Sequence, residues 1–166
     1  MLDISAKTPS LISAIFGESK ITTREMRKES RKYYMDFIAL VQAAFGLPYE
    51  NAYRELEKLN EKVTKEAGTR PEALATSIMS PSVTKLYTNE VTFKTSFNAV
   101  NAAINLYLAK AKTGRLPDEL PDGMPKDLFS GKDFIYEKTK DGFILRCQGK
   151  DLHKDKIHEY EFKVKK

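Results

Sequence analysis

The spacing of hydrophobic residues predicts one long helix in the second half of the chain. Apolar side chains recur at steps of three and four, with Glu90 as an interruption: Leu86, Phe93, Phe97, Val100, Ile104, Tyr107 and Ala111. This spacing places one continuous apolar stripe on one side of a helix from Ser82 to Gly114. Gly114 is suited to a left-handed cap, and Pro117 beyond it cannot continue the helix. Because so long a helix gains little from intrinsic propensity, we expect it to lie against a partner.

Two shorter helical patterns precede it. The first begins at a capping box at Thr22 or Thr23 and ends near Phe45, and the second spans 48–67. The expected buried positions are Met26, Tyr33, Tyr34, Phe37, Ile38, Leu40, Val41 and Ala44 in the first helix and Tyr49, Ala52, Leu56, Leu59 and Val63 in the second. The short connection at Gly46 makes the two helices antiparallel neighbours. A short helix is also expected between Thr8 and Gly17, and a linker with a brief helical turn over 69–81.

After Gly131 the period changes from that of a helix to that of a β-strand. Phe134 and Tyr136 alternate with polar residues, Asp141-Gly142 indicates a tight turn, and further strands are expected over 143–148 and 157–164. The predicted fold class is therefore α+β: an N-terminal helical hairpin, a long helix and a small three-stranded antiparallel sheet. We divide the chain into a helical layer, 1–80, and a helix-plus-sheet module, 81–166, with one compact domain as the alternative.

Composition narrows the class of protein without assigning an activity. The 166 residues are 41% hydrophobic and 31% charged, as in ordinary globular proteins, and the net charge of +5 is mild. No stretch approaches the roughly 20 apolar residues of a membrane-spanning helix, and no signal peptide is predicted. A single cysteine, Cys147, excludes an internal disulfide.

No catalytic, cofactor-binding or metal-binding residue is assigned. His153 and His158 are five residues apart, which matches no helical metal pair, so we expect solvent-exposed histidines. Cys147 follows Arg146, but neighbours on a strand point to opposite faces, so a buried thiol is expected.

The segment before the sheet is acidic, with Asp118, Glu119, Asp122, Asp127 and Asp133. A general acid–base pair needs a cleft and a raised pKa, and the sequence argues for neither. Asp127 is expected to accept backbone amides in a turn near Ser130 and Gly131.

A basic band on the first long helix is the feature that would suit a nucleic acid. It comprises Arg24, Arg27, Lys28, Arg31 and Lys32, followed by Tyr33 and Tyr34. A single-strand platform needs exposed aromatic rings, whereas these tyrosines fall on or beside the apolar stripe. The band also contains Glu25 and Glu29, as solvated helix faces do.

The segment that connects the long helix to the sheet, together with the sheet itself, resembles a known family. Gly114, Leu116, Pro117 and Leu120 match a G-x-L-P-x-x-L block; Pro125, Asp127, Phe129, Gly131, Phe134 and Tyr136 match P-x-D-P-F-x-G-x-x-F-x-Y; and Gly142, Phe143 and Leu145 match a G-F-x-L segment. The pattern resembles the C-terminal module of a bacterial protein family of unknown function, common in planctomycetes. That module is similar to the globular domain of type II secretion major pseudopilins. The match covers about a third of the chain, from residue 91 to 148.

The resemblance implies a pseudopilin-like module of an exported or envelope-associated protein. Leu128 stands where the family usually has proline, and the lysines interleaved with Asp151 and Asp155 make the calcium loop of pseudopilins a poor expectation here. The hydrophobic anchor helix of pseudopilins is missing from this sequence, so the chain could be part of a longer anchored protein.

The leading hypothesis is a non-enzymatic structural or protein-interaction module. A protein partner or self-association is expected, with the helical hairpin and the edge strand 157–164 as natural surfaces. The alternatives are a basic nucleic-acid-binding module using 24–32, and, ranked lower, a hydrolase with an unrecognised site between hairpin and sheet.

Overall fold

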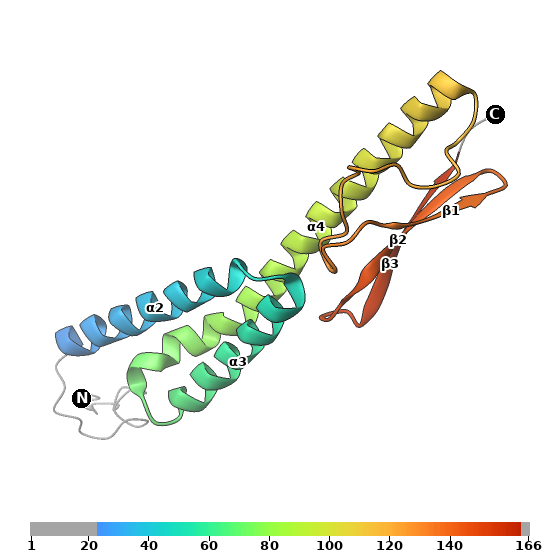
Figure 1. The fold of residues 1–166 in the computed structure, drawn as a ribbon. Helices are drawn as coiled ribbons and strands as arrows, with labels where there is room; N and C mark the ends of the chain where they lie inside the picture. Colours follow the sequence, from blue (N-terminus) through green and yellow to red (C-terminus); the bar gives the residue numbers. More distant parts are fainter. Residues whose placement is uncertain (1–22, 164–166) are drawn as a thin grey trace, which may run out of the picture.

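The computed structural model describes residues 23–163, so the expected helix between Thr8 and Gly17 lies outside the described residues. The described chain forms α2 (Thr23–Phe45), α3 (Tyr49–Ala67), the 3-10 turn η1 (Pro71–Ala73) and α4 (Leu74–Thr113). The strands β1 (Ile135–Thr139), β2 (Gly142–Asp151) and β3 (Lys156–Lys163) follow (Figure 1). The fold is α+β, which confirms the predicted class.

Helices α2 and α3 form the expected antiparallel hairpin (Figure 1). Phe37, Val41 and Ala44 of α2 are buried, as are Tyr49, Ala52, Leu56 and Val63 of α3. Leu40 was expected in this core but is 47% exposed, because it lies at the rim of the cavity between the helices. The hairpin core thus follows the predicted spacing, with a narrower buried stripe.

Helix α4 has 40 residues and begins earlier than predicted, so the expectation of a linker over 69–81 was wrong for most of that segment. Pro81 lies inside the helix, where it cannot donate to the carbonyl of Ser77. The Ser80 hydroxyl lies 3.3 Å from that carbonyl but donates its proton to Asn60 Oδ1 of α3 at 2.7 Å, which ties α4 to the hairpin. The predicted boundary between 1–80 and 81–166 falls within this helix, and the domain division stays a prediction.

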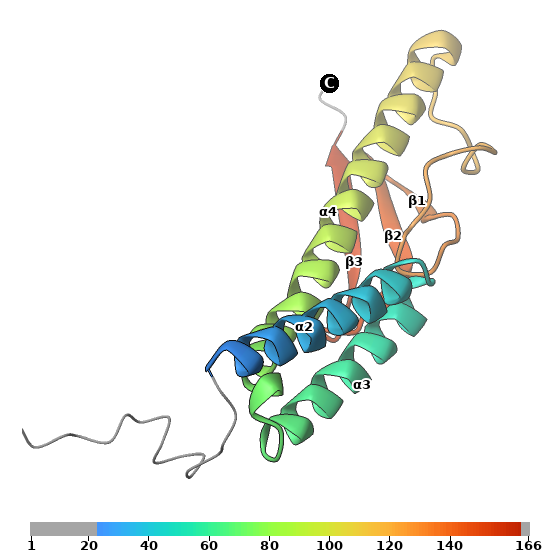
Figure 2. The ribbon, with the colours of Figure 1, turned by 90° about the vertical axis from the view of Figure 1, so that its left-hand side faces the viewer.

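The three strands form an antiparallel meander in the order β1-β2-β3. Helix α4 connects the two parts of the molecule: the hairpin lies beside its N-terminal half and the sheet beside its C-terminal half (Figure 2). Phe143, Leu145 and Cys147 of β2 are buried in one core with Ala99 and Leu106 of α4. Gly114 ends α4 with φ 78° and donates its N–H to Lys110 O at 2.8 Å, as the sequence predicts.

The face of α4 that packs on the rest of the chain is not the predicted one. The buried positions of α4 include a set spaced by four and three residues: Thr84, Thr88, Val91, Thr95, Ala99, Ala102 and Leu106. Their small side chains let the sheet and the hairpin approach the helix closely. Most of the larger apolar side chains of the predicted stripe lie on the opposite side and are exposed: Leu86, Phe93, Phe97, Val100 and Ile104. Tyr107 is the exception, since it is half-buried and its ring packs against Phe143 of β2.

Candidate functional site

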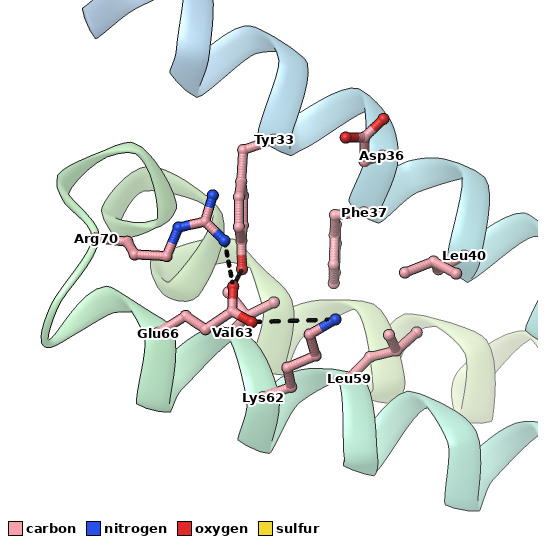
Figure 3. Close-up of a pocket in the computed structure, with 9 residues that line it drawn as sticks. All are labelled: Tyr33, Asp36, Phe37, Leu40, Leu59, Lys62, Val63, Glu66 and Arg70. Atoms are coloured by element: carbon pink, nitrogen blue, oxygen red, sulfur yellow. Dashed lines mark hydrogen bonds and ion pairs between the residues drawn. The ribbon is translucent and has the colours of Figure 1, made fainter.

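A cavity of about 190 Å³ opens between α2 and α3 (Figure 3). The Tyr33 hydroxyl donates to Glu66 Oε2 at 2.8 Å, and Arg70 Nη1 lies 3.3 Å from the same oxygen. The Arg70 guanidinium also lies over the Tyr33 ring, 5.1 Å from its centroid. Burial, together with the bond to Glu66, raises the pKa of Tyr33 to about 12. Tyr33 is therefore protonated at neutral pH, and these polar groups bind one another at the open end of the hairpin.

A larger hollow of about 690 Å³ lies between the start of α3 and the sheet. It is where the sequence placed the alternative of a hydrolase site. Tyr49 lines it, and its hydroxyl accepts the Leu152 N–H at 3.1 Å, which ties hairpin to sheet. Glu50, also on the wall, pairs with Arg54 at 2.8 Å. Two polar groups that line the hollow, the Tyr49 hydroxyl and the Glu50 carboxylate, thus bind other residues of the protein.

Asp127 lies beside this hollow and organises its floor. Its side chain is fully buried; Oδ1 accepts the Phe129 N–H at 2.9 Å, and Oδ2 accepts the Ser130 hydroxyl at 2.7 Å. The expected role as a turn cap is confirmed. Oδ2 also accepts the N–H groups of Gln148 and Gly149, at 2.9 and 2.8 Å. Asp127 therefore joins the turn to β2, a structural task that occupies both carboxylate oxygens.

Asp151 and His158 form a second buried pair. Asp151 Oδ1 accepts the N–H groups of His153 and Lys154, both at 3.0 Å, and His158 Nε2 lies 3.0 Å from Oδ2. Burial by itself raises the pKa of Asp151, but the bonds from His158 and the two amides outweigh it and lower the pKa below its usual value.

The position of His158 differs from the sequence expectation. Its side chain is only 11% exposed and its ring stacks on Phe129, with centroids 5.2 Å apart. The prediction of a solvent-exposed histidine was therefore wrong for His158, because pairing across the β2–β3 hairpin brings it back to Asp151. It holds for His153, which is exposed.

Cys147 is 1% exposed, which confirms the expected buried thiol. Burial and the nearby Asp127 carboxylate raise its pKa far above the usual range, so it stays a neutral thiol. The remaining acidic candidates are exposed and spread along the segment between α4 and β1: Asp118, Glu119, Asp122 and Asp133. Of these, Asp118 pairs with Lys138 at 2.5 Å. Over residues 23–163, no group of three or more His, Cys, Asp or Glu side chains could hold a metal ion.

The basic band on α2 keeps its charges in solvent, since Arg24, Arg27, Lys28, Arg31 and Lys32 are exposed. The two tyrosines that follow offer no stacking platform. Tyr33 binds Glu66 and is covered by Arg70, and Tyr34 is half-buried. The band therefore lacks the exposed tyrosine rings that single-strand binding uses.

The largest exposed apolar feature we find is on α4, and we call it the α4 row. It consists of Leu86, Phe93, Phe97, Val100, Ile104 and Leu108, which are between 46% and 71% exposed. Five of these belong to the stripe that the sequence indicated, but its exposure was missed. A second regular set of positions in the sequence could have revealed this exposure. Its residues are mostly small and suit close packing within the chain: 84, 88, 91, 95, 99, 102 and 106.

Comparisons with known proteins do not place the chain in a family. It matches no protein-family model and no curated protein, and its fold matches no solved structure. The resemblance to pseudopilins therefore stays a prediction. In the described part of the chain, no helix is both long and apolar enough to cross a membrane. The fold and surfaces define an α+β protein whose long central helix presents an apolar face to solvent.

Proposed function

We propose that this protein is a non-enzymatic protein-interaction module and that the α4 row is its contact surface. The row is the observation that carries the proposal. Monomeric proteins expose contiguous apolar patches of a few hundred Å², and larger ones mark interaction sites. If a large apolar side chain is taken as about 200 Å², the exposed fractions of the row amount to roughly 700 Å².

The polar groups support the same proposal. Asp127 and Asp151 use their carboxylates to hold loops, Cys147 is a buried neutral thiol, and Tyr33 binds Glu66. These four groups, which could otherwise serve as a nucleophile, acid or base, are thus engaged in the fold. We further propose an envelope-associated or exported context, which rests on the resemblance of 114–145 to pseudopilin-like modules.

A pull-down with the chain as bait tests this function. Phe93→Glu/Phe97→Glu removes the apolar character of the row, and Asn105→Glu, at an exposed position on another side of α4, is the matched control. We expect stoichiometric capture by the wild type and the control that survives high salt, and loss of capture by the double variant. If the double variant captures the same protein as the wild type, the proposal is contradicted. If the captured material is released by salt, as nucleic acid would be, the result favours the basic band instead.

A further inference from the structure

The α4 row follows a heptad repeat. Leu86, Phe93 and Val100 are seven residues apart, and so are Glu90, Phe97, Ile104 and Ala111, with the second set three or four residues from the first. This 3.5-residue spacing is the one at which two α-helices pack side chains into each other along their length. A small ligand or a sheet edge would not require it, so the spacing indicates a helix as the occupant.

The area of the row matches what a pair of copies needs. Two faces of roughly 700 Å² would bury about 1,400 Å², within the range of about 1,200–2,000 Å² for stable interfaces. The heptad positions from Leu86 to Ala111 span about 37 Å at 1.5 Å per residue. The apolar segment 11–16 of the same chain spans at most about 20 Å when extended, so it is too short to cover the row.

Glu90 decides the direction of pairing. In a parallel pair in register, Glu90 of one copy would face Glu90 of the other within the seam, and two facing carboxylates repel each other. In an antiparallel pair that overlays the heptad positions 86–111, the centre falls between positions 98 and 99. This places Phe97 opposite Val100 of the second copy, Phe93 opposite Ile104, and Glu90 opposite Tyr107 rather than opposite itself.

We infer that two copies of this chain associate through their α4 rows as an antiparallel helix pair. This inference rests on the proposed function, because it names the partner of the same surface. The hairpin and the sheet pack on the small-residue face of α4, on the other side of the helix, so the row is open to a second copy.

Sedimentation equilibrium tests the association. We expect a mass near twice 18.9 kDa for the wild type and for Asn105→Glu. Phe93→Glu/Phe97→Glu should raise the dissociation constant at least about 100-fold. A wild-type monomer at the highest concentrations, or a dimer unaffected by the double variant, would overturn the inference.

Cysteine crosslinking tests the direction. In the antiparallel pair, a mixture of Leu86→Cys and Ala111→Cys chains should form disulfide-linked dimers, whereas Leu86→Cys alone should not, since its two copies lie about 37 Å apart. The native Cys147 is buried and common to all variants. Efficient crosslinking of Leu86→Cys alone would overturn the antiparallel arrangement.

The outcomes separate this inference from the proposed function. A monomer that still captures another protein through the row disproves self-association and leaves the interaction module standing. If the chain is a monomer and captures proteins equally well without the row, both the self-association and the proposed function are disproved.

Discussion

Asp127 joins the turn at Phe129–Ser130 to strand β2 at Gln148, which lies 21 residues after Asp127 in the chain. Its carboxylate is fully buried and accepts four hydrogen bonds, so its removal leaves one buried and two part-buried backbone N–H groups without an acceptor. Close packing reinforces the link: a Cβ on Gly149 would lie 2.4 Å from the Phe129 carbonyl carbon. The turn and β2 therefore form one unit.

Asp127→Ala should lower the free energy of unfolding by roughly 3 kcal/mol or more, since each unsatisfied buried group costs about 1–3 kcal/mol. Asp127→Asn keeps one acceptor oxygen and should fall between this variant and the wild type. Urea denaturation measures the order, with the exposed Asp133→Ala as a control expected within about 0.5 kcal/mol of the wild type. Equal effects of all three substitutions would contradict the role given to Asp127.

Asp151 should make stability depend on pH. Its pKa is lowered in the folded protein, so the unfolded chain takes up its proton at a higher pH than the folded one. The stability that Asp151 contributes is therefore present above its ordinary pKa near 3.8 and is lost as the pH falls through the lowered value.

We expect Asp151→Asn to be destabilised at pH 6 and to lose less further stability than the wild type between pH 5 and pH 2.5. The check is a series of urea denaturations across this range, with the exposed Asp122→Asn as the control that keeps the wild-type slope. An unchanged slope in Asp151→Asn would show that this pair does not contribute to acid unfolding.

Helix α4 has two regular faces, and the smaller side chains lie inside. On the inner face the Thr88 hydroxyl bonds back to the helix, from Oγ1 to Thr84 O at 3.0 Å, whereas the buried hydroxyls of Thr84 and Thr95 have no hydrogen-bond partner among residues 23–163. Ser96 Oγ donates to Thr92 O at 2.9 Å and also lies 3.1 Å from the Tyr160 hydroxyl, which connects the helix to β3. The inner face thus holds the sheet near the helix while the bulkier outer face is left free.

The two faces should respond differently to truncation. Leu106→Ala empties a fully buried site in α4 and should cost about 2–5 kcal/mol. Leu86→Ala, on the exposed row, should cost less than about 1 kcal/mol. Thermal or urea unfolding at low protein concentration, where copies are separate, gives both values. The reverse order would mean that the α4 row is the inner face.

At the scale of the whole molecule, one helix connects both structural parts. Tyr49 adds a second connection: its ring packs edge-on against Phe129 at 4.9 Å, and its hydroxyl accepts the Leu152 N–H. Burial raises the pKa of this hydroxyl to about 12, so at neutral pH it accepts the Leu152 N–H as an uncharged group.

Because of these connections we expect a single unfolding transition. Far-ultraviolet circular dichroism, which reports the helices, and hydrogen exchange of the β2 amides should give the same midpoint. Two separate midpoints would instead support the division at residues 80 and 81. Tyr49→Phe should lower the common midpoint slightly, by the loss of one hydrogen bond worth about 1 kcal/mol.

The sequence by itself determined the α+β class, the helical hairpin, the end of α4 at Gly114, the sheet meander and the cap at Asp127. These features depend on local signals: the 3.6-residue period, the turn at Asp141-Gly142, and a carboxylate next to the amides it accepts. Because such signals involve residues that are close in the chain, they can be interpreted without knowledge of the tertiary contacts.

Tertiary structure alone decided which face of α4 is buried and where His158 lies. Hydrophobicity favoured the face with Phe93 and Phe97, but close approach of the hairpin and the sheet required the small face of Ala99 and Ala102. Pro81 lies inside α4, next to Ser80, whose hydroxyl binds Asn60 of α3, and His158 was buried because β3 pairs with β2. Each outcome depends on contacts between distant residues or on a side-chain geometry that composition and spacing do not encode.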